Sequence, residues 1–424
     1  MPSTDVPALI DTNHSQMADT RLANGVRVLT ERIPAVRSVA VGAWVRQGAA
    51  HERQEITGAS HLLEHLVFKG TRTRSPREIA LALERLGGSL DAFTSREHTS
   101  FQARVLPEHT DRALEILADL MLNPLLREED LELERQVVLE EISTVEDTPD
   151  DLVFELHGEA LWDGHPYGRS ILGSRESVAT MGIDALREIH QARYREGEIL
   201  VAAAGYLDHE DFVRQVETLF GSVEGHEGPQ VPEVSLETRG GNIQVTRESA
   251  QTHIVFGSRT PPRSHRARFP LVLLSAAFGG GMGSRLFQRV REELALAYTV
   301  YSFQSFYSRA GVSGVYVGTR PEWANRAVDA VREELRKISA EGLGDEELRE
   351  VKDQVKGQVM LSLESTQSRL FRLAGFPLYG LPYLNLDELL ATIEKVTRDE
   401  VAEAAARHFD PESQVVLRLG PHQG

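Results

Sequence analysis

Residues 61–71 of this 424-residue chain read HLLEHLVFKGT and hold its most informative pattern. His61 and His65 are four positions apart, so on a helix both imidazoles project from one face and can bind one metal ion. Glu64 lies between them, where a general base is needed, and the pattern is the zinc-protease motif H-E-x-x-H in reverse. The flanking residues are mainly apolar, and a buried trio without a partner would be costly. The stretch therefore predicts a zinc site on a helix over 59–69.

The third ligand of such a site must come from elsewhere in the chain. A catalytic zinc takes three protein ligands and leaves a fourth position for water. There is no cysteine, so the ligand has to be His, Asp or Glu, and the helical pattern at 128–145 supplies Glu134, Glu140 and Glu141. Glu134 and Glu141 are seven residues apart and share a helix face, whereas Glu140 points about 100° away. We therefore expect one of Glu134 and Glu141 to be a ligand and the other to hold a histidine ring.

Outward from this site, strands and helices are mixed without strict alternation. Apolar periodicity and turn residues divide the first half into elements, and Ser75 and Glu78 form a predicted capping box. The expected strands are 26–32, 38–47, 89–95, 99–105 and 198–206, and the expected helices are 59–69, 75–86, 107–122, 128–145 and 210–220. The second half is expected to hold strands 242–247, 252–257, 297–307, 311–318 and 414–419, with helices 269–278, 284–294, 321–340, 345–373 and 399–407.

The two halves repeat the same order of elements, which indicates an internal duplication of roughly 200 residues per copy. Residues 221–241 contain five glycines and two prolines among mostly polar residues and are the expected linker. We therefore predict an N-terminal zinc-binding catalytic domain over 1–220, a linker over 221–241, and a C-terminal domain over 242–424. The predicted fold class is α+β, with two similar domains of mixed or antiparallel sheet and packed helices.

Composition limits the possible partners. The formal net charge is −18, which disfavours binding to nucleic-acid phosphates. An acidic cavity would attract basic peptides. Residues 1–20 show no signal or transit peptide, and charges interrupt every apolar run before it reaches membrane-spanning length. We expect a soluble cytoplasmic protein that binds neither nucleic acid nor membrane.

These residues resemble the pitrilysin or insulysin (M16) family of zinc metallopeptidases. The family places its third ligand about 76 residues after the second histidine, in a segment E-R-x-V-V-x-x-E, and residues 134–141 here read ERQVVLEE. The resemblance implies zinc ligation by His61, His65 and Glu141, a general base at Glu64 and a supporting acid at Glu134. The resemblance also covers the second half of the chain. The chain is most similar to short members of the family, which resemble the mitochondrial processing peptidase beta subunit and its bacterial homologues.

In the second half, residues 291–298 read REELALAY and resemble the family segment R-E-x-x-G-L-A-Y. The resemblance implies that Arg291 and Tyr298 reach the substrate near the scissile bond, where Arg can clamp a carbonyl and Tyr can stabilise an oxyanion. Ala295 stands where the family usually has Gly. Without the resemblance, Arg291 would be an ordinary surface residue and Tyr298 a core residue at a strand end.

Residues 87–95, GGSLDAFTS, resemble the family's edge strand, which binds extended peptides by strand addition. The substrate-binding residues would be Asp91, Ala92 and Phe93, and Asp91 replaces an Asn that is common in the family. Backbone pairing survives this change because it uses N–H and C=O groups. An ordinary buried strand is the alternative.

The resulting hypothesis is a zinc-dependent endopeptidase or oligopeptidase that cleaves extended peptides inside a closed chamber. One Zn²⁺ per chain is expected, because the duplicated half has Leu271, Leu274, Ser275 and Gln358 at the corresponding positions. In the family a chamber needs four such domains, so we expect a homodimer in which Arg291 and Tyr298 complete the partner's site. The alternatives are a non-catalytic core or partner subunit and a peptide-binding protein.

Overall fold

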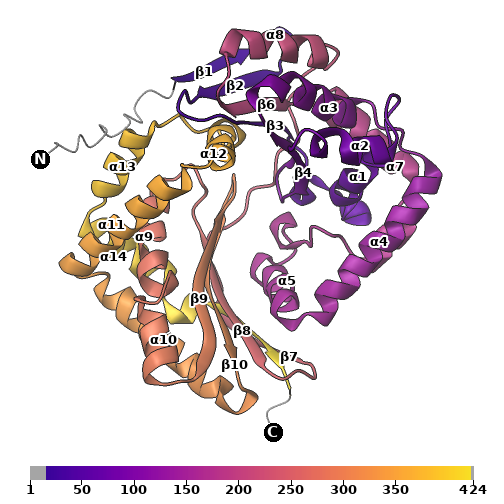
Figure 1. The fold of residues 1–424 in the computed structure, drawn as a ribbon. Helices are drawn as coiled ribbons and strands as arrows, with labels where there is room; N and C mark the ends of the chain where they lie inside the picture. Colours follow the sequence, from indigo (N-terminus) through magenta and orange to yellow (C-terminus); the bar gives the residue numbers. More distant parts are fainter. Residues whose placement is uncertain (1–15, 422–424) are drawn as a thin grey trace, which may run out of the picture.

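The structure is a computed structural model that describes residues 16–421 and contains two β-sheets with helices packed on them (Figure 1). The first sheet has the strand order β1-β2-β6-β3-β5-β4, in which only β2 and β6 pair in parallel. Its strands are β1(Gln16–Arg21), β2(Arg27–Arg32), β3(Val39–Val45), β4(Ser89–Thr94), β5(Thr99–Val105) and β6(Ile199–Gly205).

The second sheet repeats this arrangement without a counterpart of β1. Its order is β7-β11-β8-β10-β9, and β7 and β11 are its parallel pair. The strands are β7(Gly241–Thr246), β8(Thr252–Thr260), β9(Ala297–Phe306), β10(Gly311–Thr319) and β11(Val415–Gly420). The matching orders support the duplication, and the two mixed sheets with packed helices confirm the predicted α+β class.

Most helices of each half cover one face of the sheet of that half, and apolar side chains from the helices and the sheet form a large core there. The first half contains α1(Ala59–Val67), α2(Pro76–Glu84), α3(Thr110–Leu122), α4(Glu128–Asp147), α5(Pro149–Trp162), α6(Arg175–Thr180), α7(Ile183–Ile189) and α8(His209–Phe220). The second contains α9(Arg268–Gly279), α10(Ala324–Glu341), α11(Asp345–Ser362), α12(Thr366–Leu378), α13(Leu386–Glu394) and α14(Arg398–His408).

Two helices are exchanged between the halves. Helix α5 packs on β8 and β11 of the second sheet, where Val153 joins a core with Val255 and Leu417. Helix α12 packs on β2, β3 and β6 of the first sheet, where Leu370 and its neighbours meet Trp44. Figure 1 shows both helices in the space between the two sheets. Each sheet is thus covered by its own helices on one face and by a helix of the other half on the opposite face.

The expected elements are present, with two corrections and several omissions. The expected helix over 284–294 is a π-helix at Phe287–Glu293. The capping box at the start of α2 is confirmed, with Ser75 accepting from the Glu78 amide. The expected helix over 345–373 is wrong as a single element, because α11 ends at Ser362 and Ser365 caps a new helix, α12. The prediction missed β1, α5, α6, α7 and α13.

Residues 223–240 contain neither helix nor strand, as expected of a connection between the halves. The domain division at residues 221–241 stays a prediction, because the exchanged helices make each half depend on the other for part of its core. In the part of the chain described here, every helix is too short or too polar to cross a membrane.

Candidate metal and catalytic site

Helix α1 carries the two histidines on the face opposite its buried apolar side chains. Leu62, Leu63 and Leu66 pack into the first core. The Glu52 carboxylate accepts hydrogen bonds from the backbone amides of Gly58 (2.7 Å) and Ser60 (2.6 Å). It therefore satisfies amides at the helix N-terminus that have no partner within the helix. The anchored apolar face fixes the direction in which the histidines point.

His61, His65 and Glu141 converge on one point between α1 and α4. One ligand atom from each lies within 4.8 Å of the others, and Glu141 Oε2 is 3.7 Å from both His61 Nε2 and His65 Nε2. Ligand atoms of a tetrahedral zinc site lie about 3.3–3.6 Å apart, given metal–ligand distances of about 2.0–2.2 Å. Glu141 Oε2 is also buried and has no hydrogen-bond partner among the described residues. A zinc ion would satisfy this atom, so the residues fit the metal.

The protonation of His61 suits this role. Burial, and next the neighbouring His65, lowers the pKa of His61 to about 4. The imidazole is therefore neutral near pH 7, the form in which histidine binds zinc.

Glu134 holds the other histidine from behind. Its side chain is only 5% exposed, and its Oε2 lies 3.0 Å from His65 Nδ1, which donates to it when Nε2 is free to bind metal. Lys69 pairs with the second oxygen of Glu134 at 2.5 Å. Glu140, in contrast, is exposed. Glu134 and Glu141 thus both lie against the histidines, while their roles as supporting acid and metal ligand stay predictions.

Glu64 lies beside the metal position and outside the ligand group. Thr94 Oγ1 donates a hydrogen bond of 2.6 Å to Glu64 Oε2. Burial raises the pKa of the Glu64 carboxyl, while the Thr94 hydrogen bond opposes this effect. A carboxylate with a raised pKa is a stronger base.

The predicted substrate strand, β4, is an edge strand. It pairs with β5 alone in the first sheet, so its other backbone edge is free to pair within the described structure. Asp91 and Phe93 are exposed, and Ala92 is half-buried together with Thr94. The ring of Phe93 lies 5.8 Å from that of Phe371 on the exchanged helix α12. The alternative of a buried internal strand is therefore wrong.

Arg291 and Tyr298 lie against each other in the second half. Arg291 stacks over the Tyr298 ring at 4.4 Å and donates to the Tyr298 carbonyl, and the Tyr298 side chain is 76% exposed. Among the described residues, no hydrogen bond, ion pair or ring contact joins them to His61 or Glu64. Ala295, between them, has φ 50°, a left-handed conformation that favours glycine.

Three residues that support the site escaped the sequence analysis: Glu52, Lys69 and Thr94. Lys69 follows His65 by four positions, and Thr94 follows Ala92 by two on an alternating strand, so helical and strand periodicity place both on the site face. Glu52 had no such signal, because it caps α1 from outside the helix.

The corresponding place in the second half does not resemble a metal site. Leu271 and Leu274 are fully buried in its core, and Ser275 is buried beside them. Within residues 16–421, His61, His65 and Glu141 form the only group of three possible ligands.

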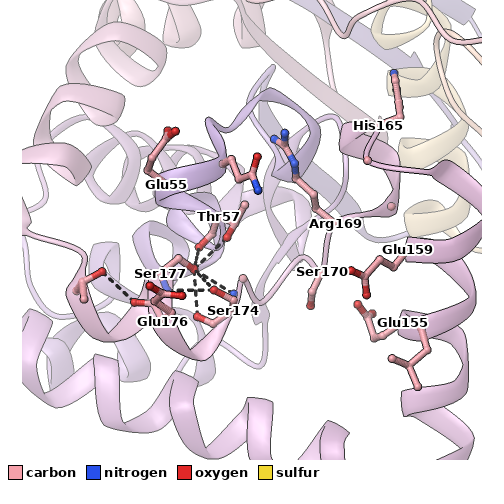
Figure 2. Close-up of a pocket in the computed structure, with 16 residues that line it drawn as sticks. Glu55, Thr57, Glu155, Glu159, His165, Arg169, Ser170, Ser174, Glu176 and Ser177 are labelled. Atoms are coloured by element: carbon pink, nitrogen blue, oxygen red, sulfur yellow. Dashed lines mark hydrogen bonds between the residues drawn. The ribbon is translucent and has the colours of Figure 1, made fainter. Parts of the chain in front are cut away.

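An acidic cavity of about 800 Å³ adjoins the segment that leads into α1 (Figure 2). Glu155 and Glu159 lie one turn apart on α5 and point to the same side, and Glu55 and Glu176 line other walls. Arg169 is the single Lys or Arg among the lining residues. None of the four glutamates forms an ion pair within the described chain, so the cavity carries uncompensated negative charge.

Models of known families match both halves of the chain. The family model described as Insulinase (Peptidase family M16) matches residues 27–175, which hold all the ligand candidates. The model described as Peptidase M16 inactive domain matches residues 180–355, the half with the buried leucines.

Similar proteins span nearly the whole chain. An uncharacterized zinc protease of Bacillus subtilis, YmxG, is 38% identical over 93% of this chain and 96% of its own length. An uncharacterized zinc protease of Mycobacterium tuberculosis, Rv2782c, is 39% identical over 95% of this chain and 93% of its own.

Solved structures share the fold at low sequence identity. A peptidase M16 inactive domain from Pseudomonas fluorescens superimposes with a TM-score of 0.90 at 20% identity, covering 96% of this chain and 99% of that one. A protease from Helicobacter pylori gives 0.88 at 20% identity, covering 96% and 100%. By its family matches and its relatives, this chain belongs to peptidase family M16 and is a zinc-dependent metalloprotease.

Proposed function

We propose that the chain is a zinc-dependent endopeptidase in which His61, His65 and Glu141 hold one Zn²⁺ and Glu64 is the general base. The observation that carries the proposal is the buried Glu141 Oε2, which has no hydrogen-bond partner among the described residues and lies 3.7 Å from the Nε2 atoms of both histidines. The described part of the second half, residues 242–421, has no equivalent group of ligands, which supports one zinc per chain.

Zinc bound here would supply Lewis acidity that lowers the pKa of water and polarises the substrate carbonyl. Glu64 takes a proton from the attacking water and delivers it to the leaving amine. Thr94 keeps the Glu64 carboxylate turned toward the site through its 2.6 Å hydrogen bond. Glu134 fixes the orientation and tautomer of His65, which leaves Nε2 as the atom available for the metal.

The substrate is an extended peptide that adds to the free edge of β4 at Asp91, Ala92 and Phe93. Strand addition uses main-chain hydrogen bonds and therefore accepts many sequences. The acidic cavity lined by Glu155 and Glu159 favours peptides with basic side chains, because its four glutamates face a single arginine.

Replacing Glu64 by glutamine tests the proposal. Zinc content measured by elemental analysis should stay at one per chain, because Glu64 is not a ligand, whereas peptidase activity should fall by a factor of about 10² to 10⁴. Glu140→Gln, on the exposed face of α4, is the matched control and should keep both. Parent activity in Glu64→Gln would disprove the mechanism. A parent protein with no zinc or no peptidase activity after zinc loading would favour the non-catalytic partner subunit.

We further propose a homodimer in which Arg291 and Tyr298 of each chain complete the zinc site of the other around a closed chamber. Both side chains lie outside contact with the metal group of their own chain, and Tyr298 is largely exposed. In this position Arg291 would bind a substrate carbonyl and Tyr298 would donate to the oxyanion.

Mixing two inactive variants tests the shared site. A heterodimer of Glu64→Gln and Tyr298→Phe chains has one site with both lesions and one site with neither. Random exchange of equal amounts should therefore restore about one quarter of the parent activity, since half of the dimers are mixed and each has one intact site. Subunit exchange without recovered activity would show that each site is completed within one chain.

A further inference from the structure

A second cavity, of about 380 Å³, lies between the exchanged helix α12 and the helices of the second half. The residues of α12 that line it are distinct from those that pack on the first sheet. Most of its wall is apolar and comes from α9, α11, α12 and α13, including Phe269, Val272, Val359, Phe376, Leu389 and Ile393. The volume is within the range of about 300–1,000 Å³ found for small-molecule sites.

The polar part of the wall is basic. Arg263, Arg268 and Arg372 line the cavity together with Gln304, and no aspartate or glutamate of residues 16–421 does. None of the three arginines forms an ion pair with any residue in the range 16–421. This is unexpected in a chain of net charge −18, in which acidic side chains outnumber basic ones.

The three guanidinium groups are held by rings and carbonyl oxygens instead of carboxylates. Arg263 lies over the Tyr379 ring at 4.6 Å, and its side chain makes no hydrogen bond within the described chain. Arg268 donates to the Arg263 carbonyl at 2.9 Å, and Arg372 donates to the Leu384 carbonyl. These contacts orient the guanidinium groups but leave their charge uncompensated.

Unsatisfied atoms also point to a missing ligand. The Nε atoms of Arg263 and Arg372 and the Oε1 atom of Gln304 are buried without a hydrogen-bond partner among the described residues. Burial, and next the charge of Arg263, lowers the pKa of Arg268. The three arginines are half-buried, and desolvated cations without a counter-ion are costly, so an anion bound among them would be favoured.

The apolar wall limits what the anion can be attached to. A peptide would bury amide groups in a cavity whose one uncharged polar side chain is Gln304, and unpaired buried amides are costly. An unbranched alkyl chain has no such groups and gains from burial against the leucine, valine and phenylalanine side chains.

We propose that this cavity binds a single-chain fatty acid, with its carboxylate among Arg263, Arg268 and Arg372 and its alkyl chain along α9, α11 and α13. The head-group chemistry is that of a small oxyanion, which a free fatty acid or a singly acylated phosphate could each supply. Binding at this cavity is independent of zinc and of peptide cleavage.

Calorimetric titration with dodecanoate below its micelle concentration tests the proposal. One molecule should bind per chain, while dodecanol and dodecyltrimethylammonium should not bind, because they lack the anionic head. The same titration is then repeated with dodecyl phosphate in place of dodecanoate. Tighter binding of the phosphate than of the carboxylate would identify an acylated phosphate as the source of the ligand.

Arg263→Gln is the informative variant, because the Arg263 side chain makes no hydrogen bond to any described residue that the substitution would remove. It should weaken dodecanoate binding at least about tenfold, the loss expected for one hydrogen bond to a charged group. Arg266→Gln, whose side chain is exposed, is the matched control and should bind as the parent does. Val272→Trp should abolish binding by filling the cavity. The proposal is overturned if the parent does not bind dodecanoate, if Arg263→Gln binds it equally well, or if an apolar tripeptide binds more tightly.

Discussion

Arg369→Met should destabilise the protein by about 3–5 kcal/mol, the usual effect of removing one partner from a buried ion pair. Arg369 lies in the first turn of the exchanged helix α12, and its Nη1 is 2.7 Å from Oε1 of Glu31 on β2. The two side chains are 13% and 2% exposed. The second oxygen of Glu31 is buried without a hydrogen bond in the described chain. The variant would therefore leave an uncompensated carboxylate between α12 and the first sheet.

The double variant separates the charge from the packing. Glu31→Leu combined with Arg369→Met removes both charges and should return to within about 1 kcal/mol of the parent, as replacements of buried pairs by apolar residues often do. Arg27→Met is the control on the same strand. Its partner Asp19 is partly exposed, so Arg27→Met should lower the free energy of unfolding by no more than about 1 kcal/mol.

Urea unfolding followed by tryptophan fluorescence and far-UV circular dichroism measures these differences. Trp44, one of three tryptophans in the chain, lies in the same core as Leu370, so part of the fluorescence change comes from the contact of α12 with the first sheet. Coincident transitions by the two probes would justify a two-state free energy. If Arg369→Met costs no more than Arg27→Met, or if the double variant is as unstable as Arg369→Met alone, the buried pair does not anchor the exchanged helix.

Two further changes test other parts of the structure. Ala295→Gly should raise the free energy of unfolding by up to about 1 kcal/mol. The left-handed conformation costs alanine about 1–2 kcal/mol, and the greater entropy of glycine in the unfolded chain offsets part of this gain. A lower free energy of unfolding in urea would contradict this prediction. His157 is buried, donates to the Val415 carbonyl at 3.1 Å, and has its pKa lowered by burial to about 4. As pH falls from about 6.5 to 4 the unfolded chain takes up this proton and the folded chain does not, so stability should fall by up to about 1.4 kcal/mol per pH unit. His157→Gln should remove this contribution to the pH dependence of the unfolding free energy, measured by unfolding curves from pH 7 to 4. An unchanged pH dependence would refute this role of His157.

The zinc-site candidates could be predicted because their geometry is local. The spacing of His61 and His65 places them on one helix face in any helix, and the seven-residue spacing of Glu134 and Glu141 does the same on α4. The capping box at Ser75 is local in the same sense, since it depends on a residue three positions away.

The omissions follow from the same limit. Strand β1 was missed because its sequence, QMADTR, is polar and its pairing with β2 is made by backbone groups. Helix α5 was missed because apolar residues lie on several of its sides, which weakens the helical period that the analysis relied on. Its start could have been found, because Pro149 at the first helical position and two following aspartates are a typical start signal.

The sequence by itself therefore determined the order of most strands and helices, the duplication that this order indicates, and the two helix faces that carry the candidate ligands. Tertiary structure alone decided that these faces meet at one point, that β4 is an edge strand, and that α5 and α12 cover the opposite sheets. It also gathered Arg263, Arg268 and Arg372, which are spread over more than a hundred residues, around one cavity. The physical reason is that periodicity shows only that an apolar face is buried. The surface that buries it depends on contacts between distant segments, which no local pattern records.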